Sequence, residues 1–178
     1  DVNSRDWFYD DVAYVYNAGL FAGTTATTFS PEASMTRAML VTVLYRLEGE
    51  PGVTGTSAFD DVVRGAYYED AVIWAAKHEI VNGVSSMQFS PNTNVTREQM
   101  AAILYRYAQY KSYRTSATTS LKGFYDANTV SGYAAAPMQW AVAEKLVNGS
   151  NGSLLPRGNA TRAQVAAILH RFVENVVK

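Results

Sequence analysis

The sequence predicts an all-α fold of three helix-loop-helix repeats that form a single body with pseudo-threefold symmetry. Two observations predict it. One pattern of Asp, Gly, Pro and Thr-Arg occurs three times along the 178 residues. After each Thr-Arg pair, apolar residues recur at the spacing of one helix face. A repeat that cannot bury its own apolar face must pack on its siblings, so three copies predict one shared core.

The three copies are assigned to residues 1–49, 58–109 and 123–178. The shared positions are Asp1, Asp61 and Asp126; Gly23, Gly83 and Gly149; Pro31, Pro91 and Pro156; and Thr36-Arg37, Thr96-Arg97 and Thr161-Arg162. In the second and third copies an aromatic, Phe59 or Phe124, precedes the Asp. The first copy begins without one, which predicts that the chain is a segment of a longer protein.

Each copy is expected to begin with a short, mostly apolar helix. In the second copy this helix covers residues 67–78 and ends ahead of Gly83. Glycine can adopt the left-handed conformation that terminates helices, and Gly23 and Gly149 hold the same place in the other copies. The three glycines are therefore expected either to stop a helix or to let a ligand approach the backbone closely.

A second helix is expected to begin at each Thr-Arg pair. Its apolar stripes are Leu40, Val43, Leu44 and Leu47; Met100, Ile103, Leu104 and Tyr107; and Val165, Ile168, Leu169 and Phe172. Gln99 and Gln164 complete a reciprocal capping box with the Thr three residues earlier, whereas Met39 provides only half of one. Three such stripes predict three helices facing a common core.

Two stretches rich in turn formers or small polar residues, 49–57 and 109–122, are expected to link the copies. Three units at this spacing favour a ring that closes on itself, because an open solenoid usually has atypical units at its ends. The spacing alone also allows a short solenoid.

Composition excludes several classes of function. The balance of 15 basic against 16 acidic residues lacks the basic excess of a nucleic-acid-binding protein. No apolar run approaches the roughly 20 residues of a membrane span. The absence of cysteine rules out disulfides and thiolate metal sites and leaves the compartment open. No cofactor or metal site is predicted.

Arg37, Arg97 and Arg162 point to a ligand, because each occupies the first position inside a predicted helix. A cation at a helix N-terminus is disfavoured by roughly 0.3–1 kcal/mol, so three in register need a compensating partner. One candidate is a salt bridge to the repeated Asp residues. The other is an external anion, held by the guanidinium fork and by the free N–H groups of the helix start. The two are compatible.

Other repeated residues suit a site of sugar size. Trp7, Tyr67 and, in a less regular context, Tyr133 follow the Asp and could pack on sugar C–H groups, although a single aromatic is more often a core residue. Asn82 and Asn148 offer amide hydrogen bonds beside two of the glycines, where the first copy has Ala22. Arg46, Arg106 and Arg171 recur near helix C-termini, where a cation is favourable, and are assigned a structural role.

These motifs resemble the S-layer homology family. The second copy reads Phe59-Asp60-Asp61-Val62, Tyr67, Ile80-Val81-Asn82-Gly83, Phe89-Ser90-Pro91 and Thr96-Arg97-Glu98-Gln99. The resemblance covers nearly the whole chain outside the linkers and implies that the repeats form a three-pronged, pseudo-threefold spindle around a central helical bundle. The family pattern ends in Thr-Arg-Ala-Glu, but Met39, Gln99 and Gln164 stand at its last position. The third copy departs most, so unequal binding by the three grooves is expected.

The resemblance implies an extracellular anchor that binds secondary cell-wall polysaccharide linked to peptidoglycan, through a pyruvylated N-acetylmannosamine residue, in grooves between repeats. It assigns ligand binding to Arg37, Arg97, Arg162, Asp1, Asp61, Asp126, Trp7 and Tyr67, with the regions of Gly23, Gly83, Gly149, Asn82 and Asn148. The alternative is a protein–protein assembly module that contacts other surface-layer proteins. An enzyme is not expected. A glycosidase needs two carboxylates that face one bond across about 5–10 Å, whereas the acidic pairs here are sequence neighbours, whose side chains point in different directions. The two histidines lie in different elements, without a repeated Ser, Cys or metal-ligand partner.

Overall fold

The computed structural model describes residues 1–177, which contain six α-helices, two from each repeat. They are α1 (Tyr9–Asn17) and α2 (Arg37–Leu47), α3 (Glu69–Lys77) and α4 (Arg97–Tyr110), and α5 (Ala135–Ala143) and α6 (Arg162–Phe172). Two short 3-10 helices, η1 (Ala127–Thr129) and η2 (Gly132–Ala134), precede α5, and a short π-helix, η3 (Val173–Val177), follows α6. The predicted all-α class is confirmed. Lys178, the last residue of the predicted third repeat, lies outside the described residues.

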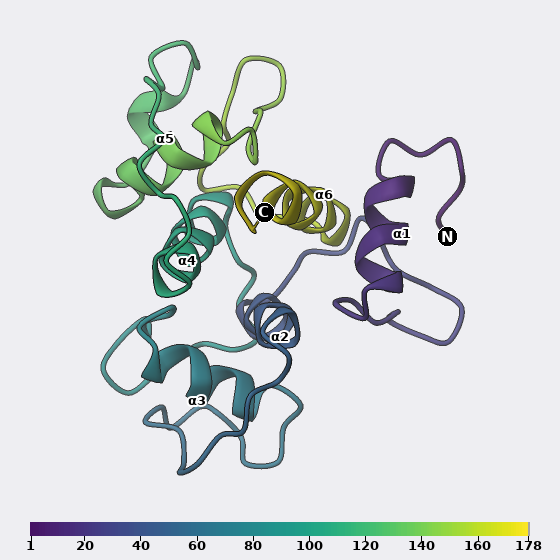
Figure 1. Cartoon of the computed structure of the whole chain (residues 1–178), viewed down its shortest axis with the longest axis vertical. Helices are drawn as coiled ribbons and strands as arrows, with labels where there is room; N and C mark the ends of the chain where they lie inside the picture. Colours follow the sequence, from purple (N-terminus) through teal and green to yellow (C-terminus); the bar gives the residue numbers. More distant parts are fainter. Residues whose placement is uncertain (178) are drawn as a thin grey trace.

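The helices α2, α4 and α6 lie around the middle of the molecule, with α1, α3 and α5 outside them (Figure 1). Each outer helix packs on the central helix of the preceding repeat: α3 on α2, α5 on α4, and α1 on α6. Because the last of these contacts joins the first repeat to the third, the repeats form a closed ring rather than an open stack. The residues of the three predicted stripes are buried, except for the partly buried Leu47.

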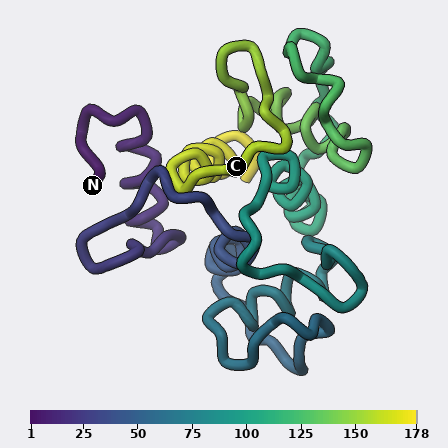
Figure 2. The backbone as a smooth tube through the Cα atoms, turned by 180° about the vertical axis from the view of Figure 1, so that it is seen from behind, coloured from purple at the N-terminus to yellow at the C-terminus, as the bar shows by residue number. Residues whose placement is uncertain are grey.

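Three backbone hydrogen bonds link the repeats just before the central helices begin. The N–H of Met35 donates to the carbonyl of Ala160 over 2.9 Å, Ala160 to Val95 over 3.1 Å, and Val95 to Met35 over 2.9 Å. All three residues are fully buried. The segments that lead into α2, α4 and α6 converge near the middle when the molecule is seen from behind (Figure 2). No repeat can leave this triangle without breaking two of its three bonds.

The starts of the central helices are occupied by loop carbonyls of the neighbouring repeat. The N–H groups of Arg37 and Ala38 donate to the carbonyls of Thr93 and Pro91 over 2.9 and 3.0 Å, and the other two helices follow the same scheme. The third N–H of each helix donates to the hydroxyl of the capping Thr. The hypothesis that free N–H groups here bind an external anion is therefore wrong, because these donors already have partners.

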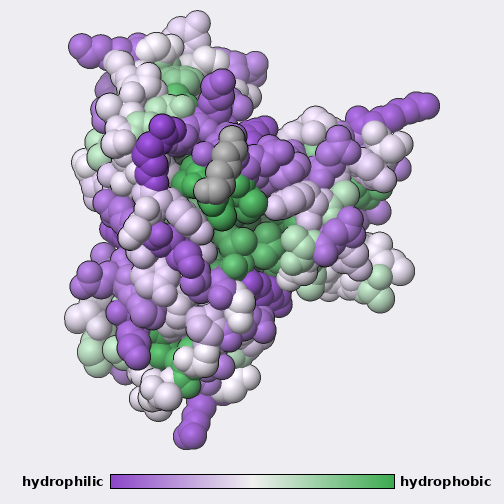
Figure 3. Space-filling model, viewed as in Figure 1, coloured by the Kyte–Doolittle hydropathy of each residue, from purple (hydrophilic) through white to green (hydrophobic). Residues whose placement is uncertain are grey.

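The capping chemistry agrees with the sequence. Complete capping boxes are present at Thr96 and Thr161, and Thr36 accepts only the N–H of Met39. On the face shown in Figure 3, hydrophilic and intermediate residues dominate, and apolar side chains appear mainly near the middle. Within residues 1–177, no helix combines the length and apolar character needed to cross a membrane.

The predicted role of the repeated glycines as helix stops is wrong. Helix α3 ends at Lys77, and the left-handed residue after it is Glu79, with a φ of 57°. Gly83 has no positive φ, and a Cβ there would lie 2.2 Å from the carbonyl oxygen of Ser85 and 2.6 Å from that of Gln88. Gly23 is crowded in the same way by two loop carbonyls. Close backbone approach within the loop, rather than helix termination, therefore requires glycine at both positions.

Candidate functional site

Three equivalent grooves lie between the repeats, and each is lined by residues from all three. Groove 1 runs beside α2 and is lined by Arg162, Ala22, Gly23, Met39, Arg46 and Tyr67, among others. Groove 2 runs beside α4 and is lined by Arg37, Asn82, Gly83, Gln99, Arg106 and Tyr133. Groove 3 runs beside α6 and is lined by Arg97, Asn148, Gly149, Gln164, Arg171 and Trp7. Because each groove needs every repeat, no single repeat can form one.

The motif arginines, Arg37, Arg97 and Arg162, connect neighbouring repeats. Arg37 donates from Nε to the carbonyl of Phe89 and from Nη2 to that of Asn82, both over 2.9 Å. Its guanidinium carbon lies 4.7 Å from the centre of the Phe89 ring. Arg162 makes the same two bonds to Phe29 and Ala22, both over 2.7 Å. Arg37 and Arg162 are therefore each held by two backbone carbonyls of the next repeat in the ring.

The motif arginines differ in exposure. Arg37 and Arg162 are only 5% and 6% exposed, whereas Arg97 is partly exposed. Arg97 donates from Nε to the carbonyl of Leu154 over 2.8 Å and from Nη1 to Oε1 of Gln164 over 3.4 Å. Burial lowers the pKa of all three guanidiniums, although arginine keeps its charge in proteins. Arg97 is thus the most exposed residue of the three motif arginines.

The repeated aspartates hold loops in place. Asp61 accepts the N–H of Phe89 at Oδ1 over 2.8 Å and that of Ser90 at Oδ2 over 2.7 Å, and Asp1 and Asp126 bind the equivalent pairs. Among residues 1–177, no ion pair joins a motif arginine to these aspartates. The salt-bridge hypothesis is therefore wrong, because backbone N–H groups occupy the carboxylates. The aspartates lie behind the loops whose carbonyls receive the motif arginines.

This role predicts a pH-dependent effect at Asp126. Burial alone would raise the pKa of Asp126, but N–H bonds from Leu154 and Leu155 and the charge of Arg97 outweigh burial and lower it. We expect Asp126→Asn to lose about 1 kcal/mol of stability at neutral pH, because an amide oxygen can accept only one of the two bonds and solvent screens the site.

The Asp126 contribution is present above pH 3.8 and is lost as the pH falls through the lowered pKa of the folded state. Urea unfolding at pH 7 and at successively lower pH should therefore show the wild-type and Asp126→Asn curves converging in acid. A stability difference that stays constant over this range would contradict the role assigned to the carboxylate.

Each groove has one exposed aromatic side chain. Trp7, Tyr67 and Tyr133 are 63%, 64% and 53% exposed, so none of them is a core residue. The Trp7 ring packs edge-on against the Phe8 ring, with 5.3 Å between the ring centres, and the Tyr67 ring packs in the same way against the Tyr68 ring, with 5.1 Å between the centres. Three aromatic faces are thus available to a ligand, including the one in the less regular third copy.

The second arginines, Arg46, Arg106 and Arg171, also line the grooves. Arg46 donates to the carbonyl of Leu20 and lies 3.7 Å from Glu50, and Arg171 donates to the carbonyl of Leu146. Within residues 1–177, Arg106 has neither an ion pair nor a side-chain hydrogen bond. In the sequence, these arginines are recognisable because each stands nine residues after a motif arginine. The purely structural role assigned to them from the sequence is incomplete, because all three residues also line the grooves.

Each groove therefore has two guanidiniums and, among its described lining residues, no carboxylate. The chain as a whole has a net charge of −1, so the positive charge is a local property of the grooves. Grooves 1 and 3 each have a volume of about 430 Å³, in the lower part of the range for small-ligand sites, and groove 2, at about 270 Å³, lies just below that range. This combination favours a small acidic ligand with apolar faces.

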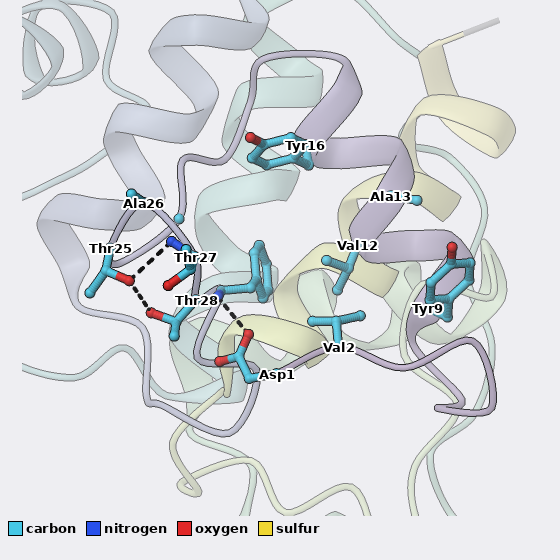
Figure 4. A pocket seen from close by; sticks show the side chains of 12 residues that line it. Asp1, Val2, Tyr9, Val12, Ala13, Tyr16, Thr25, Ala26, Thr27 and Thr28 are labelled. Atoms are coloured by element: carbon cyan, nitrogen blue, oxygen red, sulfur yellow. Dashed lines mark hydrogen bonds between the residues drawn. The ribbon is translucent and has the colours of Figure 1, made fainter.

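A further cavity of about 410 Å³ belongs to the first repeat alone. Its wall includes Tyr9, Val12 and Tyr16 on α1, and its rim includes threonines of the loop 25–28 (Figure 4). In the other repeats Phe59 and Phe124 pack beside Gly83 and Gly149. No arginine lines this cavity among the described residues, so it is not a fourth copy of the grooves.

An all-α ring of three repeats with three cationic, aromatic-edged grooves defines the chain as a repeat module built for binding. Within residues 1–177, no cluster of His, Asp and Glu is placed to hold a metal. The chain belongs to the S-layer homology family, since the model of the S-layer homology domain matches residues 1–38, 58–101 and 123–166.

The relatives include both surface proteins and enzymes. The chain is 33% identical over 177 residues to an endoglucanase of Bacillus sp. (strain KSM-635), covering 99% of this chain and 19% of that protein. It is 33% identical to an amylopullulanase of Thermoanaerobacterium thermosulfurigenes, covering 95% and 9%. It is 32% identical to the surface-layer 125 kDa protein of Lysinibacillus sphaericus, covering 93% and 14%. The chain spans a fifth or less of these relatives, as expected of a non-catalytic anchoring module shared by different proteins.

Proposed function

We propose that this chain anchors its parent protein outside the cell by binding secondary cell-wall polysaccharide, through a pyruvylated N-acetylmannosamine residue, in the grooves between repeats. The observation that carries this proposal is that every groove is lined by a pair of arginines and, among its described lining residues, by no carboxylate. A pyruvyl ketal provides a carboxylate for the guanidiniums, and the sugar provides C–H faces for the aromatic ring. Surface-layer and polysaccharide-degrading relatives share this segment, which fits attachment of different proteins to one polymer.

The proposed division of roles follows the geometry. The motif arginines form the floor of each groove. Those of their guanidinium N–H groups that do not bind backbone carbonyls are available to the ligand. The second arginines, all partly exposed, bind the carboxylate, and Asn82 and Asn148 offer amides to the sugar in grooves 2 and 3. The aspartates act indirectly by fixing the loops. Groove 1, with Ala22 and Met39 at the corresponding positions, has the fewest polar partners and should bind most weakly.

Calorimetric titration with the methyl glycoside of pyruvylated N-acetylmannosamine tests the proposal. We expect the triple variant Arg46→Ala/Arg106→Ala/Arg171→Ala to lose about 1.5–3 kcal/mol of binding free energy per groove, the scale of a lost charged hydrogen bond. The monovalent sugar avoids the avidity by which several grooves on one wall polymer would mask the loss.

The matched control is Arg5→Ala/Arg64→Ala/Arg157→Ala, which removes one exposed arginine outside the grooves from each repeat. It changes the net charge equally and should leave binding unchanged. Equal binding of the glycoside without its pyruvyl group, or equal losses in the two triple variants, would refute carboxylate recognition in the grooves. If the chain were instead a protein–protein assembly module with a broad interface, this sugar would not block the binding of its protein partner.

A further inference from the structure

Glu98 is a buried carboxylate with no counterpart in the other repeats. It is 5% exposed, and Ala38 and Ala163 occupy the equivalent positions after the motif arginines of the first and third repeats. Glu98 accepts the N–H of Ser131 over 2.9 Å, the hydroxyl of Ser131 over 2.7 Å and the hydroxyl of Tyr133 over 3.3 Å. One carboxylate at the start of α4 thus holds the segment of the third repeat that presents the aromatic side chain of groove 2.

The other two grooves orient their aromatic residues differently. Trp7 and Tyr67 are each followed by an aromatic neighbour, Phe8 or Tyr68, against which the ring packs edge-on. Tyr133 is followed by Ala134, which offers no ring. The substitution that removes the packing partner in the third repeat is therefore matched by a carboxylate in the second repeat that binds the Tyr133 hydroxyl.

We propose that Glu98 is a positioning residue that orients Tyr133 over the two arginines of groove 2 and thereby sets the affinity of that groove. The inference rests on the proposed function, because it concerns the same ligand. Glu98 does not line the groove, so its charge does not meet the ligand directly. An aromatic ring fixed before binding loses less side-chain entropy when the ligand arrives.

A background variant isolates groove 2 for the test. Arg46→Ala/Arg171→Ala disables grooves 1 and 3, and the methyl glycoside of pyruvylated N-acetylmannosamine is then titrated into it. We expect Glu98→Ala to weaken this binding about five- to tenfold, the scale of one ordinary hydrogen bond, because Glu98 acts on the ligand only through Tyr133. Tyr133→Phe should have a similar effect, and the double variant should be no weaker than either single one. Glu98→Gln keeps an acceptor oxygen and should recover part of the affinity.

The complementary background, Arg46→Ala/Arg106→Ala, leaves only groove 3, and Glu98→Ala should not change its affinity. Equal weakening of grooves 2 and 3 would mean that Glu98 has a structural role only and would overturn the proposal. So would unchanged affinity of groove 2. Glu98→Ala is expected to fold, since alanine occupies this position in the other repeats.

A measurement without ligand separates this inference from the proposed function. Burial raises the pKa of Tyr133, and Glu98 raises it further. Titration of the Tyr133 ring signal by NMR should therefore show a lower pKa in Glu98→Ala than in the wild type. An unchanged titration would overturn the positioning role, whereas a lower pKa in a protein that does not bind the glycoside would refute only the proposed ligand.

Discussion

Arg37→Ala should destabilise the protein by about 3–5 kcal/mol, because it leaves two carbonyls at a repeat junction without their donors and opens a cavity above an aromatic ring. The carbonyls are those of Phe89 and Asn82, and the ring is that of Phe89. Arg37→Lys should lose most of the same free energy, since an ammonium cannot replace the planar fork at both acceptors. Urea unfolding followed by circular dichroism measures the change.

Arg106→Ala is the matched control for this loss of stability. It removes the same side chain from the same groove, but Arg106 is less enclosed than Arg37 and its side chain donates no hydrogen bond among the described residues. We expect its stability to stay within about 0.5 kcal/mol of the wild type while the affinity of groove 2 falls. Two variants of equal stability would contradict the division between an arginine that joins repeats and an arginine that faces the ligand.

The sequence predicted the all-α class, the three central helices and their caps because each depends on local spacing. Thr96 and Gln99 form their capping box within one turn, and the stripes follow the helical period. The partners of the motif arginines could not be predicted in this way. Arg162 reaches carbonyls 133 and 140 residues away, at Phe29 and Ala22, and backbone acceptors leave no mark in a sequence.

The wrong prediction of a salt bridge between the aspartates and the motif arginines has the same cause, because here too the partners are backbone groups. A carboxylate and a guanidinium at fixed positions in each repeat suggest a pair, and charge complementarity favours one. In the fold, Asp61 binds the N–H groups of the loop at Phe89, and Arg37 binds the carbonyl of the same residue. The two charges thus act on opposite sides of one loop. Only the three-dimensional path of that loop shows that they cooperate without touching.

Gly83→Ala should deform groove 2 and cost at least about 3 kcal/mol, because a methyl group there meets fixed backbone on two sides. The new Cβ would lie 2.2 Å from the carbonyl oxygen of Ser85, 2.6 Å from that of Gln88 and 2.6 Å from the Phe59 ring. Relief requires the loop to move, and the carbonyl of Asn82, which accepts Nη2 of Arg37, moves with it. Binding in groove 2 and the junction between the first two repeats should therefore fail together.

Gly123→Ala provides the comparison, because a Cβ at Gly123 meets nothing within 4 Å and its φ is not in the left-handed region. Its unfolding free energy should stay within about 0.5 kcal/mol of the wild type. In Gly83→Ala, grooves 1 and 3 should still bind the pyruvylated glycoside under conditions where the variant is folded, so the stoichiometry falls while the remaining sites keep their affinity. If Gly83→Ala kept wild-type stability and full stoichiometry, the loop would be more adaptable than its carbonyl contacts imply, and its fixed shape could not be what places Arg37 in the groove.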